Sequence, residues 1–185
     1  MNTPKVITGP FLLLTAASLF WLAGAFARPP EAETPAKAHQ LSAGDEKAIR
    51  DAVKDQEAAW NKHDMKAFTK AFRDDAEGVN VVGMHWRGKT EILKHLTAYH
   101  DTIFKDLEET IEEVNVHATG VGSAIAVSVW KVGSFKVPSG IVVPACRHRS
   151  TLVLAKASDG WKVVHFHNTT INEVAVKNAP APPKK

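Results

Sequence analysis

The hydrophobic period of the chain changes along its length, from helical in the first half to alternating in the second. Ile49, Val53, Gln56 and Trp60 recur at the spacing of one helix face. From about residue 107 onward apolar and polar residues alternate, as in strands whose two faces meet different surroundings. Helices followed by a run of antiparallel strands predict an α+β domain in which helices cover one face of a sheet.

Capping and turn residues divide this pattern into elements. Ser42 is expected to begin the first helix, Asp64 a short second helix, and Thr90 a third. Between the second and third helices, residues 74–78 are predicted to form a polar turn and residues 79–86 a strand. Later strands are predicted at residues 112–117, 123–132, 147–157 and 161–172, with a loop through Pro138 before the last two.

The ends of the chain differ from this domain. Lys5 precedes 22 uncharged residues that end in Ala-Phe-Ala at positions 25–27, which predicts a secretory signal peptide. An uncleaved membrane anchor is the alternative, because a stretch of that length can span a bilayer. In both cases the domain is expected outside the cytoplasm, either periplasmic or secreted. The predicted organisation is a signal peptide at 1–27, a flexible spacer at 28–41, one domain at 42–173 and a disordered tail at 174–185.

Composition excludes some partners and leaves others open. The 23 basic and 20 acidic residues give a net charge of +3, but no cluster of Lys and Arg suggests nucleic-acid binding. The single cysteine, Cys146, cannot form an internal disulfide and is expected to fill apolar space at a strand start, with a nucleophilic role as the alternative. His165 and His167 have workable metal-ligand spacing, but no third ligand is expected near them, so no metal is predicted.

The last two predicted strands form a hairpin across Ser158-Asp159-Gly160. A three-residue loop would place Ala157 opposite Trp161. Side chains alternate across a strand, so one face of the hairpin would carry four cross-strand pairs: Leu154 with Val164, Leu152 with Phe166, Ser150 with Asn168, and His148 with Thr170. The other face would carry Arg149, Thr151, Val153, Trp161, Val163, His165 and His167, as a surface or a subunit contact.

The first of these faces is the better candidate for the helix-covered core. Its apolar half would pack inward, and its polar end would form the mouth of a cavity. The alternative is that these polar residues only hydrogen-bond one another at a rim.

Several segments resemble one protein family. The sequence DGWKVVHFHNT at 159–169 resembles the final strand of nuclear transport factor 2-like domains, especially the ending of the calcium/calmodulin-dependent kinase II association domain. The sequences WNKHD at 60–64 and FRDDA at 72–76 resemble the opening of SnoaL-like members, as do VNVVG at 79–83 and WRGK at 86–89. The FHNT ending is most similar to bacterial SgcJ/EcaC-type proteins. The resemblance covers about residues 45–173.

This resemblance implies a cone-shaped, curved antiparallel sheet wrapped on three N-terminal helices, a pocket inside the cone, and homodimers joined through the sheet. Such relatives include ketosteroid isomerases, epoxide hydrolases, dehydratases, polyketide cyclases and non-catalytic assembly hubs, so the fold alone does not define a function. The kinase association domain has pocket arginines at the positions of Leu152 and Asn168, and their replacement argues against anion binding of that kind.

These observations together suggest an exported pocket protein that binds a small apolar molecule without a cofactor. It either only binds, or performs acid–base chemistry of the isomerase, dehydratase or cyclase type. The alternative is a non-catalytic oligomerisation or interaction module. The candidate catalytic residues are His148 as acid or base, Asn168 as orienting donor, and Tyr99; the candidate ligand-binding residues are Trp60, Phe166, Leu152, Ser150 and Trp130.

Asp75 and His100 are further titratable candidates. Asp75 is also a good turn-capping residue. Tyr99 and His100 are neighbours on a predicted helix and are not expected to face inward together. After signal cleavage no membrane contact is expected.

Overall fold

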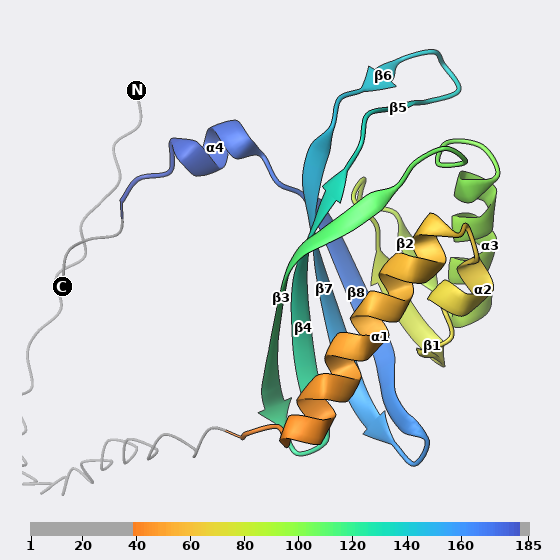
Figure 1. The fold of residues 1–185 in the computed structure, drawn as a ribbon. Helices are drawn as coiled ribbons and strands as arrows, with labels where there is room; N and C mark the ends of the chain where they lie inside the picture. Colours follow the sequence, from red (N-terminus) through yellow and green to blue (C-terminus); the bar gives the residue numbers. More distant parts are fainter. Residues whose placement is uncertain (1–38, 182–185) are drawn as a thin grey trace, which may run out of the picture. The chain divides into compact units, whose positions relative to one another are not determined.

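A computed structural model of the chain describes residues 39–181 (Figure 1). The predicted signal peptide and nearly all of the predicted spacer lie outside these residues. No helix within residues 39–181 is long and apolar enough to cross a membrane. The elements are α1 (Ala43–Asn61), α2 (Met65–Phe68), β1 (Phe72–Val79), β2 (His85–Arg87), α3 (Lys89–His100), β3 (Glu109–Gly120), β4 (Ser123–Val132), β5 (Phe135–Lys136), β6 (Val142–Val143), β7 (Cys146–Ala157), β8 (Gly160–Thr170) and α4 (Glu173–Lys177).

Six strands form one sheet in the order β2-β1-β8-β7-β4-β3. All neighbours in it are antiparallel except β1 and β8, which run parallel. The short strands β5 and β6 pair separately as a hairpin. Helices α1 and α3 cover one face of the sheet (Figure 1). The predicted α+β class is therefore confirmed.

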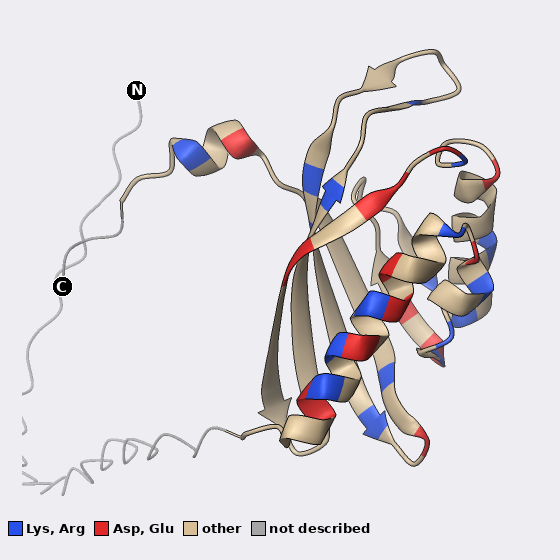
Figure 2. Ribbon diagram, viewed as in Figure 1, with Lys and Arg blue, Asp and Glu red and all other residues tan. Residues whose placement is uncertain are grey.

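Helix α1 begins where the sequence predicts. The backbone N–H of Asp45 donates a 3.1 Å hydrogen bond to Ser42 Oγ, which satisfies a free donor of the first turn. The buried face contains the predicted Ile49, Val53, Gln56 and Trp60. Both signs of charge alternate along the exposed side of this helix (Figure 2).

Polar side chains tie α1 to β3, the edge strand of the sheet. Asn61 donates to the carbonyl oxygen of Glu109 and accepts from its N–H, both at 2.9 Å. Glu57 accepts from the N–H of Ile111 at 2.7 Å, and Arg50 donates to the carbonyl oxygen of Val114 at 2.7 Å. These bonds occupy backbone groups that an edge strand would otherwise leave unpaired.

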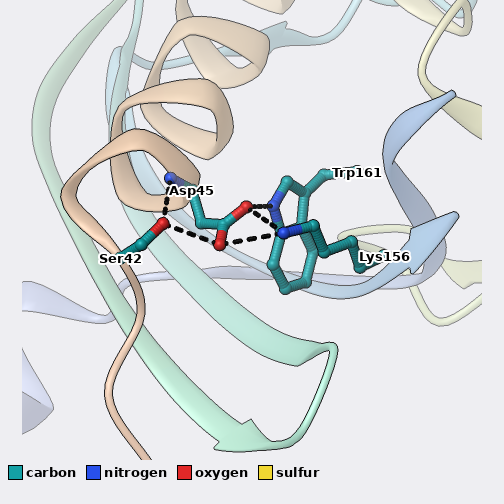
Figure 3. Close-up of polar contacts among 4 residues, drawn as sticks. All are labelled: Ser42, Asp45, Lys156 and Trp161. Carbon is teal, nitrogen blue, oxygen red and sulfur yellow. Dashed lines mark hydrogen bonds and ion pairs between the residues drawn. The ribbon is translucent and has the colours of Figure 1, made fainter. Parts of the chain in front are cut away.

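A second tie joins the first turn of α1 to the end of the β7–β8 hairpin (Figure 3). Asp45 Oδ1 accepts from the indole N–H of Trp161 at 2.9 Å and lies 2.8 Å from Lys156 Nζ. Ser42 Oγ also donates to this carboxylate, at 2.8 Å. Hydrogen bonds from Lys156, Trp161 and Ser42 lower the pKa of Asp45 to about 2.

The β7–β8 hairpin differs from its prediction near the turn. Ala157 pairs with Gly160 rather than Trp161, and Leu154 pairs with Val163 rather than Val164, so the loop has two residues. A register shift then leaves Val164 as an extra residue and restores the predicted pairs of Leu152, Ser150 and His148. Because of this bulge, Trp161 and Val163 are buried in the core, and their predicted placement on the outer face is wrong.

Three other predictions of local structure are wrong. Residues 74–78 belong to β1 and not to a turn, while the chain at residues 80–84 turns between β1 and β2. Gly88, with φ of 81°, begins α3 in place of Thr90. The tail predicted to be disordered from residue 174 contains most of α4, which begins at Asn172 through a side-chain cap. The predicted loop through Pro138 is present, as the turn between the unpredicted short strands β5 and β6.

Candidate functional site

A cavity of about 500 Å³ lies between the helix-covered face of the sheet and the elements that cover it. Helices α1, α2 and α3 line one side, β7 and β8 line the other, and the β1–β2 loop and the β5–β6 hairpin contribute further residues. The lining residues are Gln56, Trp60, Phe68, Phe72, Asn80, Val81, Val82, Trp86, Leu96, Tyr99, Ile103, Phe104, Glu109, Trp130, Phe135, Val137, Val143, Pro144, Cys146, His148, Ser150, Leu152, Phe166, Asn168 and Thr170.

All eight residues predicted for the site line this cavity. They come from α1, α3, β4, β7 and β8, and the sheet register brings the strand residues together. In the register, Trp130 pairs with His148, Ser150 pairs with Asn168, and Leu152 pairs with Phe166. Leu152 and Phe166 are 5% and 6% exposed, so the apolar end of this face is inside as predicted.

Seven aromatic side chains of the wall contact one another in a closed cycle. Neighbouring ring centroids in this cycle lie between 5.6 and 6.2 Å apart, which is normal aromatic packing. We call it the aromatic cycle; in order around it are Trp60, Phe68, Phe72, Phe166, Trp86, Tyr99 and Phe104. Its members lie far apart in sequence, so the cycle depends on the complete fold.

Glu109, which the sequence did not indicate, is a titratable residue in the cavity wall. The residue is 7% exposed, and burial raises the pKa of its carboxyl to about 8. Its backbone is held by Asn61, as described above, while its side chain makes no hydrogen bond or ion pair within residues 39–181. At neutral pH this group therefore holds a proton inside the cavity.

His148 lies two residues along β7 from Cys146, and both side chains line the cavity. The two are in contact, with Cys146 Sγ 3.3 Å from His148 Nε2. Burial lowers the pKa of His148, so its imidazole is neutral at neutral pH. Burial and the nearby Glu109 raise the pKa of the Cys146 thiol, which favours its predicted role as an apolar filler over that of a nucleophile.

Buried polar atoms without a partner within residues 39–181 gather in the residues of the wall. Four of the five such atoms belong to lining residues, namely Gln56 Nε2, Trp60 Nε1, Trp86 Nε1 and Asn168 Oδ1, and the fifth is His100 Nε2. Two other polar groups of the wall are paired: Trp130 donates to Ser128 Oγ at 2.8 Å, and the Tyr99 hydroxyl lies 3.2 Å from Met84 Sδ. The cavity thus combines apolar walls with a few polar groups.

Two other titratable candidates lie outside the cavity wall. Asp75 is exposed on β1 and paired with Arg73, which lowers the pKa of Asp75. His100 is 3% exposed and packs edge-on against Trp60, with its Nδ1 2.8 Å from Nδ1 of His63. Burial, followed by the repulsion of His63, lowers the pKa of His100 to about 4.

Tyr99 and His100 do not both face the cavity, as predicted. Tyr99 lines the cavity, whereas His100 points toward α1 and is buried there. The two neighbours meet different surroundings because α3 packs against β1 and β2 on one side and against α2 on another, where His100 also contacts Trp60 of α1.

The paired histidines of β8 lie on the outer side of the sheet, as predicted. His165 pairs with Val153 and Glu77, and His167 pairs with Thr151 and Val79. Within residues 39–181 no group of three His, Cys, Asp or Glu side chains is placed to hold a metal ion.

The profile of the SnoaL-like domain matches residues 49–171, which is most of the chain. The protein belongs to the SnoaL-like family. An uncharacterised protein of Caulobacter vibrioides with a cystatin-like fold is 34% identical, has a TM-score of 0.71, and aligns over 74% of this chain and 96% of its own. No protein in a search of curated proteins matches.

More distant structures share the fold of this SnoaL-like domain. A ketosteroid isomerase-like protein of Erwinia carotovora atroseptica is 21% identical, with a TM-score of 0.56 over 68% of this chain and 95% of its own. A nuclear transport factor 2-like protein of unknown function from Pseudomonas putida is 18% identical, with a TM-score of 0.61 over 80% and 100%. The expected nuclear transport factor 2-like fold is therefore confirmed.

Proposed function

We propose that this SnoaL-like domain binds a small, largely apolar molecule in the cavity. The observation that supports this most directly is the cavity itself, about 500 Å³ in volume and lined by all seven residues of the aromatic cycle. Ligand sites in proteins have this size and combine apolar walls with a few placed polar groups. Solid side-chain packing would be expected of a domain whose core served only stability.

We further propose that Glu109 and His148 give the cavity a proton donor and a proton acceptor. A carboxyl with a pKa of about 8 is protonated at neutral pH, and a histidine with a lowered pKa is neutral there. Such a pair can remove a proton from carbon beside a carbonyl group and protonate the carbonyl oxygen. Isomerisation, dehydration and cyclisation without a cofactor all use these steps, and a ketosteroid isomerase-like protein shares the fold. Asn168 and Tyr99 would orient the substrate.

Binding can be tested with N-phenyl-1-naphthylamine, an uncharged fluorophore that brightens in apolar sites. Ser150→Phe fills the cavity, whereas Thr151→Phe places the same ring on the opposite face of β7. We expect the dye to bind the wild type and Thr151→Phe with similar affinity and Ser150→Phe at least tenfold more weakly. Equal binding by both variants would contradict binding in the cavity.

The natural ligand can be sought by mass spectrometry of small molecules that co-purify with the exported protein. The recovered molecule, incubated with protein in D₂O, would then exchange a carbon-bound hydrogen if acid–base chemistry occurs. We expect His148→Gln to slow this exchange at least a hundredfold. Recovery of a ligand that shows no exchange would support binding without catalysis. If neither an apolar molecule nor the dye binds, the result would favour the alternative that the domain is a non-catalytic interaction module.

A further inference from the structure

Among the described residues, the cavity wall contains an acidic side chain but no Lys or Arg to balance it. Glu109 is the one carboxyl among the lining residues, and within residues 39–181 no Lys or Arg lines the cavity. The other titratable groups in the wall are His148, Cys146 and Tyr99. Of these only His148 could carry a positive charge, and its burial favours the neutral form. No described side chain of the wall therefore compensates an ionised Glu109.

Burial without a partner is costly for a carboxylate, and a cation close by removes that cost. Aromatic faces attract cations as well, because their π-systems are negative at the face. The aromatic cycle contains two tryptophans, a tyrosine and four phenylalanines. A positively charged group on an otherwise apolar molecule would thus meet a carboxylate and electron-rich rings together. Both the carboxylate and the ring faces would repel an anionic ligand.

We propose that the ligand of this cavity is a lipophilic amine whose ammonium group pairs with Glu109. This rests on the proposed function, because the amine occupies the same cavity. When the ammonium form enters from water, the Glu109 carboxyl releases its proton to solvent and becomes the counter-ion. When the uncharged amine enters, the carboxyl proton moves to the amine nitrogen. In both cases the bound pair is an ammonium and a carboxylate, so with this ligand the ammonium replaces the Glu109 carboxyl as the proton donor.

Three probes share the same hydrocarbon cage and differ in charge: 1-adamantylamine, 1-adamantanol and 1-adamantanecarboxylate. Comparing them distinguishes the effect of charge on binding from the effect of shape. Isothermal titration calorimetry measures their dissociation constants for the wild type. At pH 7.5 we expect the amine to bind at least tenfold more tightly than the alcohol, and the carboxylate to bind least. Binding of the alcohol tests the cavity, and preference for the amine tests its ligand class.

Glu109→Gln keeps the shape of the protonated side chain and removes the charge. This variant should weaken amine binding at least tenfold and leave alcohol binding within about twofold. Glu108→Gln is the matched control, because Glu108 is the exposed neighbour of Glu109, and it should change neither probe.

The wild-type pH dependence provides a second measure that needs no variant. Because amine binding displaces a proton from Glu109, its affinity should rise between pH 6 and pH 8, by up to about tenfold per pH unit. Cys146 and Asn61 lie near Glu109, and His148 contacts Cys146. Asn61 does not titrate, and the uncharged alcohol should not change the protonation of the other two residues, so its affinity should stay constant. Alcohol binding without amine preference, or amine preference that survives Glu109→Gln, would overturn the proposal. If no probe binds, the proposed function falls with it.

Discussion

Gly78 in β1 lies so close to the ring of Phe166 in β8 that a Cβ atom at position 78 would overlap the ring atoms Cε1, Cδ1 and Cζ. The two residues are also register partners in the parallel pair of β1 and β8. Phe166 belongs to the aromatic cycle, so the absence of a side chain at Gly78 determines where one ring of the cavity wall can lie.

Gly78→Ala should therefore move Phe166 and destabilise the fold. We expect a loss of roughly 1–3 kcal/mol in the free energy of unfolding, measured by urea denaturation, and weaker dye binding. Gly120→Ala in β3 is the control, because the nearest atom to a Cβ there is Ser123 Cβ at 4.0 Å. Equal stability of the two variants would show that Phe166 accommodates the methyl group without cost.

Glu109 should make the protein less stable as pH rises. Its pKa is about 8 in the folded state and near 4.5 in the unfolded chain, so between these values the folded state binds the extra proton. Stability is then highest below about pH 4.5, falls on the order of 4 kcal/mol as pH rises to 8, and changes no further through this group. Thermal unfolding of Glu109→Gln should lack this loss, so the variant should exceed the wild type at pH 9. If the melting temperatures of the two proteins changed with pH in the same way, this would contradict the raised pKa of Glu109.

Asp45 should affect stability in the opposite pH range. Its folded pKa of about 2 lies below the ordinary aspartate pKa of 3.8, so its contribution is complete above about pH 4 and is lost as pH falls toward 2. Asp45→Asn should melt at a lower temperature than the wild type at pH 6, and the difference should shrink at pH 2. Glu46→Gln, in the same turn of α1 but without the tie to the hairpin, should show a smaller effect.

Cys146 offers a direct probe of the cavity, since it is the single cysteine of the chain. Burial raises the pKa of its thiol, so less thiolate is available to react. At pH 8 we expect iodoacetamide to alkylate Cys146 at least tenfold more slowly in the folded protein than in urea, and a bound ligand to slow it further. Mass spectrometry gives both rates. Full reactivity in the folded state would contradict the half-buried position of Cys146 in the cavity wall.

The predicted homodimer would cover the outer side of the sheet, where Val127 pairs with Thr151. Val127→Asp should then yield a monomer by light scattering. Val121→Asp is the control, because Val121 is exposed in the β3–β4 turn, away from that surface. A wild type that is monomeric at micromolar concentration would contradict the prediction.

Much of the fold follows from short-range patterns. The helical spacing of Ile49 to Trp60 predicts α1 and its buried face, and alternation predicts β4 with its correct ends. Strand β1 was missed because Arg73, Asp74 and Asp75 on its exposed part resemble turn residues. Ala76 and Gly78 show their packing role only when β8 lies beside them.

The site was only partly predictable for a similar reason. The shared face of His148, Ser150 and Leu152 follows from alternation, but their predicted partners on β8 are right only because the extra residue at Val164 offsets the shorter loop. Glu109 follows the acidic residues Asp106 and Glu108, so the sequence suggests that it is exposed to solvent. In the structure, Asn61 binds the backbone of Glu109 and thereby holds it under α1. A raised pKa depends on what surrounds a carboxyl, and that is a property of the assembled fold.

The bulge at Val164 divides β8 into two halves. Odd-numbered side chains face the core in one half, and even-numbered side chains face it in the other. The half next to the turn packs Trp161 and Val163 into the core, and the other half presents Phe166 and Asn168 to the cavity. A change in turn length during evolution can therefore be absorbed by gaining or losing the extra residue. A SnoaL-like domain with a hairpin of different length can then keep the same side chains facing its cavity.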